Sequence, residues 1–217
     1  MRAKRMIYVM GTDGAGKTTL TTKYVNELHK RGLNVSYLYA RYFPFLSIPV
    51  KFLSKLIIYK KETEFSDFEG YSKKKSKFSE KHKIVSKIYI LICLIDYILI
   101  SFPRVYYKYI ISDIIIVDRY LVDFIVTLSI AAKLNVSHSK ILYQFIQKIF
   151  PIPTDVFFLE VSSKIAFSRK NDIPSLKYLE ERKEFYYKFQ EICNFQVLDG
   201  SKKSDELLTL LKNKLNL

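Results

Sequence analysis

The chain has 217 residues and a formal net charge of +15, from 36 Lys and Arg against 21 Asp and Glu. Hydrophobic residues make up 49% of the sequence, which excludes a disordered chain, and the length is ample for a core that needs no metal or disulfide. The two cysteines, Cys93 and Cys193, give neither a disulfide framework nor a metal-ligand spacing. The positive balance favours a polyanionic partner, which could be a nucleic acid, an anionic membrane or a nucleotide.

The first part of the sequence predicts strands alternating with a helix. In chain order we expect a buried strand over 5–10, a helix over 17–31 that ends at Gly32, a strand over 33–40 and a proline-broken loop over 41–50. The N-terminus is basic and then apolar, like a signal peptide. Its apolar stretch is only about five residues long and runs into a glycine motif, so we reject that interpretation.

A lysine-dense segment over 72–87 leads into the most apolar segment, Ile88–Phe102. This apolar segment is shorter than the roughly 20 residues that a membrane span needs, and Asp96 lies inside it. We therefore expect a buried helix and a cytoplasmic protein.

The second half again alternates strands and helices. We expect strands over 113–117, 155–161 and 195–198, and helices over 121–133, 139–150, 163–169, 177–192 and 204–215. The strand Asp113–Val117 is apolar throughout its interior, as strands covered on both faces are. The sequence thus predicts a single α/β domain over 1–217, with a five-stranded parallel sheet flanked by helices on both faces.

The most specific motif lies between the first strand and the first helix. Residues 11–18 fit G-x-x-x-x-G-K-[ST] at every fixed position. Glycines let backbone N–H groups wrap around phosphate oxygens, and the helix N-terminus adds positive charge. The alternative is a glycine-rich turn with a chance lysine. The residues predicted to bind ATP are Gly11, Thr12, Asp13, Gly14, Ala15, Gly16, Lys17, Thr18 and Thr19, with Lys17 on the β- and γ-phosphates and Thr18 on Mg²⁺.

The rest of the sequence narrows the class of nucleotide-binding protein. A switch GTPase should carry a base-reading N-K-x-D motif, which is absent, and Asp67–Gly70 matches D-x-x-G only by spacing. Motor ATPases and helicases are normally longer. Three features instead indicate a small-molecule kinase. They are an early phosphate loop, Asp118-Arg119 at the end of a strand, and a basic segment late in the chain.

Four patches of the sequence resemble the thymidylate kinase family. They are GTDGAGKTT at the loop, IIIVDRY at the third strand, LEVSSKIAFSRK at the fourth strand and VLDGSKKSDEL near the end. The resemblance implies the three-layer P-loop kinase fold, with a lid at about 169–182. It also implies a homodimer packed through helices, for which the apolar helix is a candidate surface.

The resemblance implies roles for particular residues. Asp118 would lie near the metal and Arg119 would hold the acceptor's phosphate, aided by Arg41, while Asp13 would face the acceptor's sugar. Arg169 is the best match for the catalytic lid charge. The weaker matches are Lys170, Lys177 and Arg182, and the stretch near adenine is Asp199-Gly200-Ser201. Without the resemblance, these residues could be a helix cap, a loop support and ordinary surface charges.

The acceptor half departs from the family pattern. Tyr97 replaces the usual arginine on the helix before the third strand, and Cys93 stands at the usual phenylalanine position. Tyr97 could instead stack on a base. The donor half therefore matches the family better than the acceptor half.

These observations predict an enzyme that transfers the γ-phosphoryl of MgATP to dTMP, giving dTDP and ADP. One alternative is a P-loop kinase acting on another nucleotide, a nucleoside or a small phosphoacceptor. Another is a nucleic-acid or membrane-surface binding protein that uses the loop as an ATP switch, supported by the lysines between 73 and 87, which a solvated surface helix also explains. A third is a relative that has lost activity.

Overall fold

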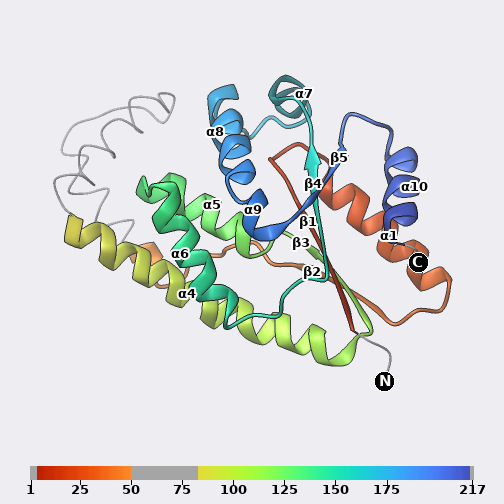
Figure 1. The fold of residues 1–217 in the computed structure, drawn as a ribbon, viewed down its shortest axis with the longest axis horizontal. Helices are drawn as coiled ribbons and strands as arrows, with labels where there is room; N and C mark the ends of the chain where they lie inside the picture. The colour runs from red at the N-terminus through yellow and green to blue at the C-terminus, as the bar shows by residue number, and fades with distance from the viewer. Residues whose placement is uncertain (1–3, 50–82, 216–217) are drawn as a thin grey trace.

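The structure is a computed structural model that describes residues 4–49 and 83–215. Five strands form one all-parallel sheet in the order β2-β3-β1-β4-β5 (Figure 1). They are β1 (Arg5–Met10), β2 (Val35–Tyr39), β3 (Ile114–Asp118), β4 (Asp155–Glu160) and β5 (Gln196–Asp199). The helices are α1 (Lys17–Lys30), α4 (Lys83–Ile111), α5 (Leu121–Ala132), α6 (Val136–Gln147), α7 (Ser163–Ser168), α8 (Leu176–Tyr187), α9 (Gln190–Cys193) and α10 (Ser204–Leu215).

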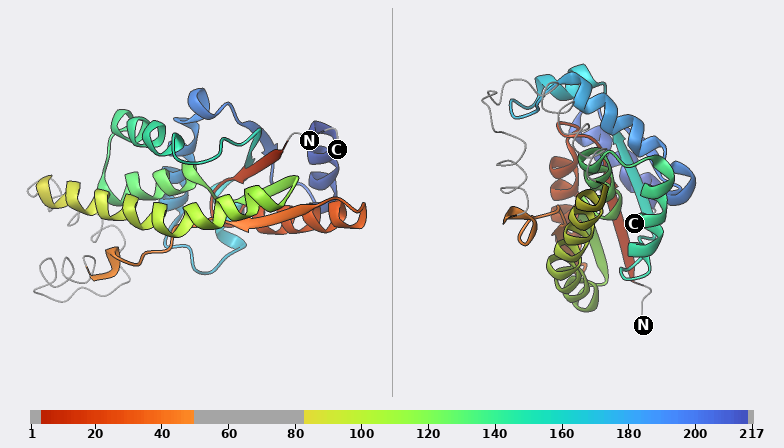
Figure 2. Two further views of the ribbon diagram at one scale, coloured as in Figure 1. Left: turned by 90° about the horizontal axis from the view of Figure 1, so that it is seen from below. Right: turned by 90° about the vertical axis from the view of Figure 1, so that its left-hand side faces the viewer.

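Helices cover both faces of the sheet, so the predicted three-layer α/β fold is confirmed (Figure 2). Successive residues of a strand point to opposite faces. In β1, Tyr8 and Met10 pack with α4, α5 and α6, whereas Ile7 and Val9 pack with α1 and α10. The central strands are apolar on both faces because each face carries its own core.

The predicted elements are largely confirmed, with bounds that shift by a few residues. The strand over 5–10 and the helix over 204–215 have the expected bounds, and Gly32 ends α1 in the left-handed region at φ 75°. The helix expected over 177–192 is instead two helices, α8 and α9. The chain turns between them at Phe189, which is fully buried against Tyr143. The stretch over 50–82, with most of the lysine segment and Asp67–Gly70, lies outside the described residues.

Helix α4 is longer and less buried than expected. It runs for 29 residues and continues through Pro103. By length and composition alone, its segment Ile84–Ile111 is apolar enough to cross a membrane, with mean hydropathy 2.1, and 28% of its most apolar window is buried. One face, with Cys93, Tyr97 and Val105, packs in the core. The prediction of a buried helix therefore holds for one face only.

The opposite face of α4 is an exposed apolar stripe. Its residues recur at spacings of three and four, and they are Ile84, Ile88, Leu91, Ile95, Leu99 and Phe102. Asp96 lies on the inner side, where its carboxylate accepts hydrogen bonds from the amides of Phe45, Leu46 and Ser47 at 2.7–3.1 Å. Asp96 thus anchors the segment after β2 rather than facing solvent.

Candidate active site

The phosphate-loop motif lies at the carboxyl end of β1, between β3 and β4. Gly11, Gly14 and Gly16 have φ of 151°, 80° and 92°. A Cβ on Gly11 would lie 2.6 Å from the carbonyl oxygen of Leu159, and one on Gly14 would collide with the carbonyl of Ala166. The loop therefore presses against β4 and α7 with its backbone, which only glycine permits at these positions.

The N-terminus of α1 is open to an anion. Gly16 caps the helix without a side-chain hydrogen bond, and the first turn contains no acidic residue. The first N–H groups of a helix have no partner within the helix, so the N-terminus of the 14-residue helix α1 attracts negative charge. Thr12 and Ala15 are buried in the loop, whereas Thr18 and Thr19 are exposed at the start of the helix. This arrangement fits the phosphates of a nucleotide.

Lys17 is a buried cation inside the loop. Its ammonium donates to the carbonyl oxygen of Thr12 at 2.6 Å, and the residue is 5% exposed. Burial and then the charge of Arg119 lower the pKa of Lys17 to about 8, against the carboxylates of Asp123, Asp118 and Asp13. An incoming anion would stabilise the charged form.

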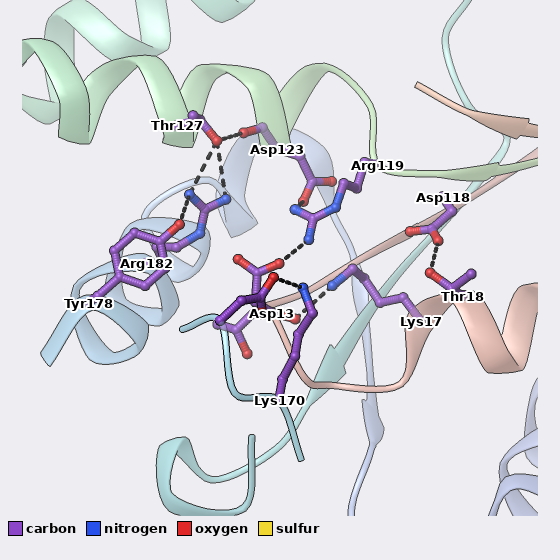
Figure 3. A network of polar contacts seen from close by, with 12 residues as sticks. Asp13, Lys17, Thr18, Asp118, Arg119, Asp123, Thr127, Lys170, Tyr178 and Arg182 are labelled. Atoms are coloured by element: carbon purple, nitrogen blue, oxygen red, sulfur yellow. Dashed lines mark hydrogen bonds and ion pairs between the residues drawn. The ribbon is translucent and has the colours of Figure 1, made fainter. Parts of the chain in front are cut away.

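Thr18 and Asp118 meet at the edge of the sheet. The Thr18 hydroxyl donates to Asp118 Oδ2 at 2.5 Å, while Asp118 Oδ1 is buried and has no hydrogen-bond partner among the described residues (Figure 3). Burial raises the pKa of Asp118, against the Thr18 hydrogen bond and the charge of Lys17. A free carboxylate oxygen beside a hydroxyl suits a hard divalent cation, and Mg²⁺ in phosphate sites takes only one or two protein ligands. The residues therefore fit Mg²⁺.

Arg119 is held in an unusual conformation one residue further on. Its φ of 63° is left-handed, which is uncommon for a residue with a side chain. The guanidinium pairs with Asp13 and, at 3.6 Å, with Asp123 (Figure 3). Burial acts to raise the pKa of Asp13, but Arg119, Arg182 and Lys17 outweigh it and lower that pKa to about 2. Asp13 is therefore ionised at all ordinary pH values.

Asp123 is the centre of a buried polar network that the sequence interpretation missed. Its carboxylate accepts from the hydroxyls of Tyr8 and Tyr186, both at 2.5 Å, in addition to facing Arg119. Arg119 and Asp123 are four positions apart at the start of α5, and this spacing is the sequence signal that could have revealed their ion pair. The network joins β1, α5 and α8 beneath the site.

Three of these residues, Asp13, Arg119 and Asp123, line a cavity of about 220 Å³. It is lined by Asp13, Arg41, Tyr42, Pro44, Arg119, Asp123, Phe124, Thr127, Tyr178 and Arg182. The volume is below the roughly 300–1,000 Å³ of most small-molecule sites, so the cavity suits a small ligand. The structure thus brings Arg41, Asp13 and Arg119 together at one cavity beside the phosphate loop.

Two predicted site residues do not reach this cavity. Tyr97 is buried and stacks on Phe124, with ring centroids 4.1 Å apart and planes 7° apart, so its ring is covered and unavailable to a base. Phe124 lines the cavity in its place. Arg169 is exposed and donates to the carbonyl of Gly200 at 3.0 Å. The arginine from the predicted lid segment that lines the cavity is Arg182.

The stretch Asp199-Gly200-Ser201 lies against the phosphate loop. Gly200 donates to the carbonyl of Glu160 at 2.6 Å, and a Cβ there would come 3.1 Å from the carbonyl of Ala15. Asp199 accepts from the amide and the hydroxyl of Ser201 at 3.0 and 2.6 Å. The turn after β5 is thus a neighbour of the phosphate loop.

Comparison with known proteins adds no relative to this picture. Neither a scan against protein-family models nor a search of curated proteins finds a match for the chain.

Proposed function

We propose that this protein is an ATP-dependent kinase of the thymidylate kinase type, which transfers the γ-phosphoryl of MgATP to the phosphate of a small acceptor. The observation that carries the proposal is the juxtaposition of two sites. A phosphate loop with a buried Lys17 and a Thr18–Asp118 pair lies next to a cavity lined with arginines. A donor nucleotide at the first site would direct its terminal phosphate toward the second.

The proposed chemistry needs no covalent intermediate. An oxygen of the acceptor's phosphate attacks the γ-phosphorus, the new P–O bond forms, and the bond to the β,γ-bridging oxygen breaks with ADP leaving. Such transfer depends on positioning and on stabilising the negative charge of the transferred group. Lys17 would hold the β- and γ-phosphates and Arg119 would orient Asp13 against the acceptor. Mg²⁺, when bound by Thr18 and Asp118, would neutralise charge on the β- and γ-oxygens.

The resemblance to thymidylate kinases, which is better in the donor half than in the acceptor half, makes dTMP the first acceptor to test. The alternatives are another mononucleotide, a nucleoside or a smaller phosphoacceptor, since Tyr97 is covered by Phe124 and the cavity is small.

We also propose a cytoplasmic homodimer that pairs through the exposed stripe of α4. Spacings of three and four residues place the stripe on one face of α4, as in a helix-to-helix seam, so a second copy of the helix could cover it.

The proposal is tested by measuring ADP release with MgATP against dTMP, dUMP, other monophosphates and nucleosides. We expect release that depends on one class of acceptor, and a loss of at least a hundredfold in Lys17→Met. The control is thermal unfolding of that variant. Because burial disfavours the charged amine of Lys17, the variant should melt no lower than the native protein at pH 7.

Hydrolysis without any acceptor dependence, or full activity of folded Lys17→Met, would exclude the kinase. The switch alternative predicts instead that the protein binds DNA or anionic vesicles, and that this binding weakens steeply with salt.

A further inference from the structure

The carboxylate of Asp118 lies on the face of the sheet that α1 covers, and a side chain of the neighbouring strand reaches it there. Ile114 and Ile116, which alternate with Asp118 along β3, pack in the core beneath α1. Tyr37 of β2 is paired with Ile116, and its ring packs against the same core. Tyr37 and Asp118 therefore point to one face from adjacent strands, and the tyrosine hydroxyl meets the carboxylate.

Two hydroxyls donate to the same oxygen of Asp118. The Tyr37 hydroxyl lies 3.2 Å from Oδ2, and the Thr18 hydroxyl lies 2.5 Å from it. The other oxygen, Oδ1, is buried and has no partner in the part of the chain that the structure describes. A buried acceptor without a partner costs free energy, so this uneven arrangement is explained best by a ligand that Oδ1 would bind.

The cations next to Asp118 in the site bond to other groups. Lys17 donates to the carbonyl oxygen of Thr12 at 2.6 Å, and Arg119 pairs with the carboxylates of two other aspartates. The charge of Lys17 acts on Asp118, but no hydrogen bond joins the two among the described residues. Oδ1 is therefore free for a cation that arrives with a nucleotide.

We infer that Tyr37 is a positioning residue for the divalent cation of the nucleotide. By donating to Oδ2 together with Thr18, it fixes the orientation of the Asp118 carboxylate and keeps Oδ1 for the metal. Hydrogen-bond partners of this kind orient metal-binding carboxylates, and their loss typically weakens metal binding by about 10–100-fold. The inference rests on the proposed kinase function and adds to it a residue of β2 that the sequence interpretation did not include.

The test measures the binding of Mn²⁺ to the complex of the protein with ADP, in the absence of any acceptor. Mn²⁺ prefers the same oxygen ligands as Mg²⁺. When it binds to the protein it tumbles slowly and enhances the relaxation of water protons, whereas Mn²⁺ with ADP in solution does so only weakly. We expect Tyr37→Phe, which removes only the hydroxyl, to raise the dissociation constant of Mn²⁺ about tenfold. Its affinity for ADP in EDTA, measured by calorimetry, should equal that of the native protein.

The matched control is Tyr24→Phe, the same chemical change on α1. The hydroxyl of Tyr24 is buried and has no partner among the described residues, and its ring packs in the core away from the site. Its removal should change neither the Mn²⁺ affinity nor the ADP affinity. Both variants keep the aromatic ring that packs in the core, so each should still unfold in one cooperative transition.

Native Mn²⁺ affinity in Tyr37→Phe would overturn the inference whether or not its melting temperature falls, since a purely structural hydroxyl would change stability alone. A tenfold loss of ADP affinity in EDTA would overturn it too, because the change would then act on the phosphate loop and not on the metal. Failure of the native protein to bind ADP would refute the kinase proposal, and this inference with it.

Discussion

At the scale of single residues, the lowered pKa of Lys17 should make the proposed nucleotide binding depend on pH. Its pKa of about 8 in the free protein lies below the usual value because of burial and of Arg119. Phosphates bind the protonated amine, so above about pH 8 a growing fraction of the protein must take up a proton before it can bind. Affinity should then fall by up to tenfold for each further pH unit.

We therefore predict that the dissociation constant for MgATP, measured by calorimetry, rises more than tenfold between pH 7.5 and pH 9.5. Lys17→Arg is the matched variant, since a guanidinium stays charged over this range. Its binding should be weaker at pH 7.5 and nearly independent of pH. An equally steep loss in Lys17→Arg would assign the titration to another group.

At the scale of elements, two glycines with left-handed φ, Gly14 in the phosphate loop and Gly32 after α1, differ in what a side chain would meet. Gly14→Ala combines a left-handed φ of 80° with a collision against the backbone of Ala166. Gly32→Ala has a similar φ of 75° but open space around it. The second change should cost only about 1–2 kcal/mol, the penalty of a left-handed alanine.

We predict that Gly14→Ala lowers the melting temperature more than Gly32→Ala does and also abolishes ATP binding, because the loop must move away from α7. Gly32→Ala should lower it by about 2–8 °C and leave ATP affinity unchanged. Equal effects of the two changes on ATP binding would show that the contact with α7 does not shape the loop.

The stripe of α4 supplies a second prediction for an element. Burial of a leucine contributes roughly 2 kcal/mol, and a two-fold interface buries each leucine twice. Leu99, which is 61% exposed in the single chain, should therefore account for about 4 kcal/mol of pairing, or roughly a thousandfold in the dissociation constant.

We predict a dimer for the native protein by light scattering and a monomer for Leu99→Glu, which should still unfold cooperatively but at a lower temperature because it loses the stabilisation of pairing. Lys30→Gln is the control, because it changes the net charge by the same amount at an exposed position of α1. A monomeric native protein that sediments with vesicles would instead assign the stripe to a membrane surface.

At the scale of the whole molecule, ligand binding should stabilise the fold as one unit. The loop contacts β4 and α7 directly, and α10 packs with α1 in the same core. A nucleotide that holds the loop in place should therefore also stabilise the elements packed against it. A ligand at a hundred times its dissociation constant adds about 2.7 kcal/mol to stability. For a chain of this size that corresponds to roughly 5–10 °C.

We predict that MgATP raises the melting temperature by this amount. The rise should be smaller when EDTA removes the metal, because Thr18 and Asp118 then no longer bind the Mg²⁺ that would join them to the nucleotide. The variant Thr18→Val should show the smaller rise in melting temperature both with MgATP and with ATP plus EDTA. The exposed Thr22 of the same helix gives the control, Thr22→Val, whose response to the metal should match that of the native protein.

Much of the fold could be predicted from the sequence, because apolar strands and helix-ending glycines are local signals. The tightly wound phosphate loop could also be predicted, since its residues are contiguous between Gly11 and Thr18. The role of Asp96 could not, because its partners lie about fifty positions earlier in the chain. Nor could the positions of Tyr97 and Arg182, which depend on packing against α5.

The phosphate loop, although it lies near the start of the chain, is completed by residues near its end. Leu159, Ala166 and Gly200 form the surface on which its backbone rests, and Arg5 at the start of β1 donates to the carbonyl of Leu215 at 2.7 Å. During synthesis the loop therefore leaves the ribosome long before its support exists. Under the proposed function, a nascent chain should gain affinity for ATP only after β5 and the turn at Gly200 have emerged from the ribosome.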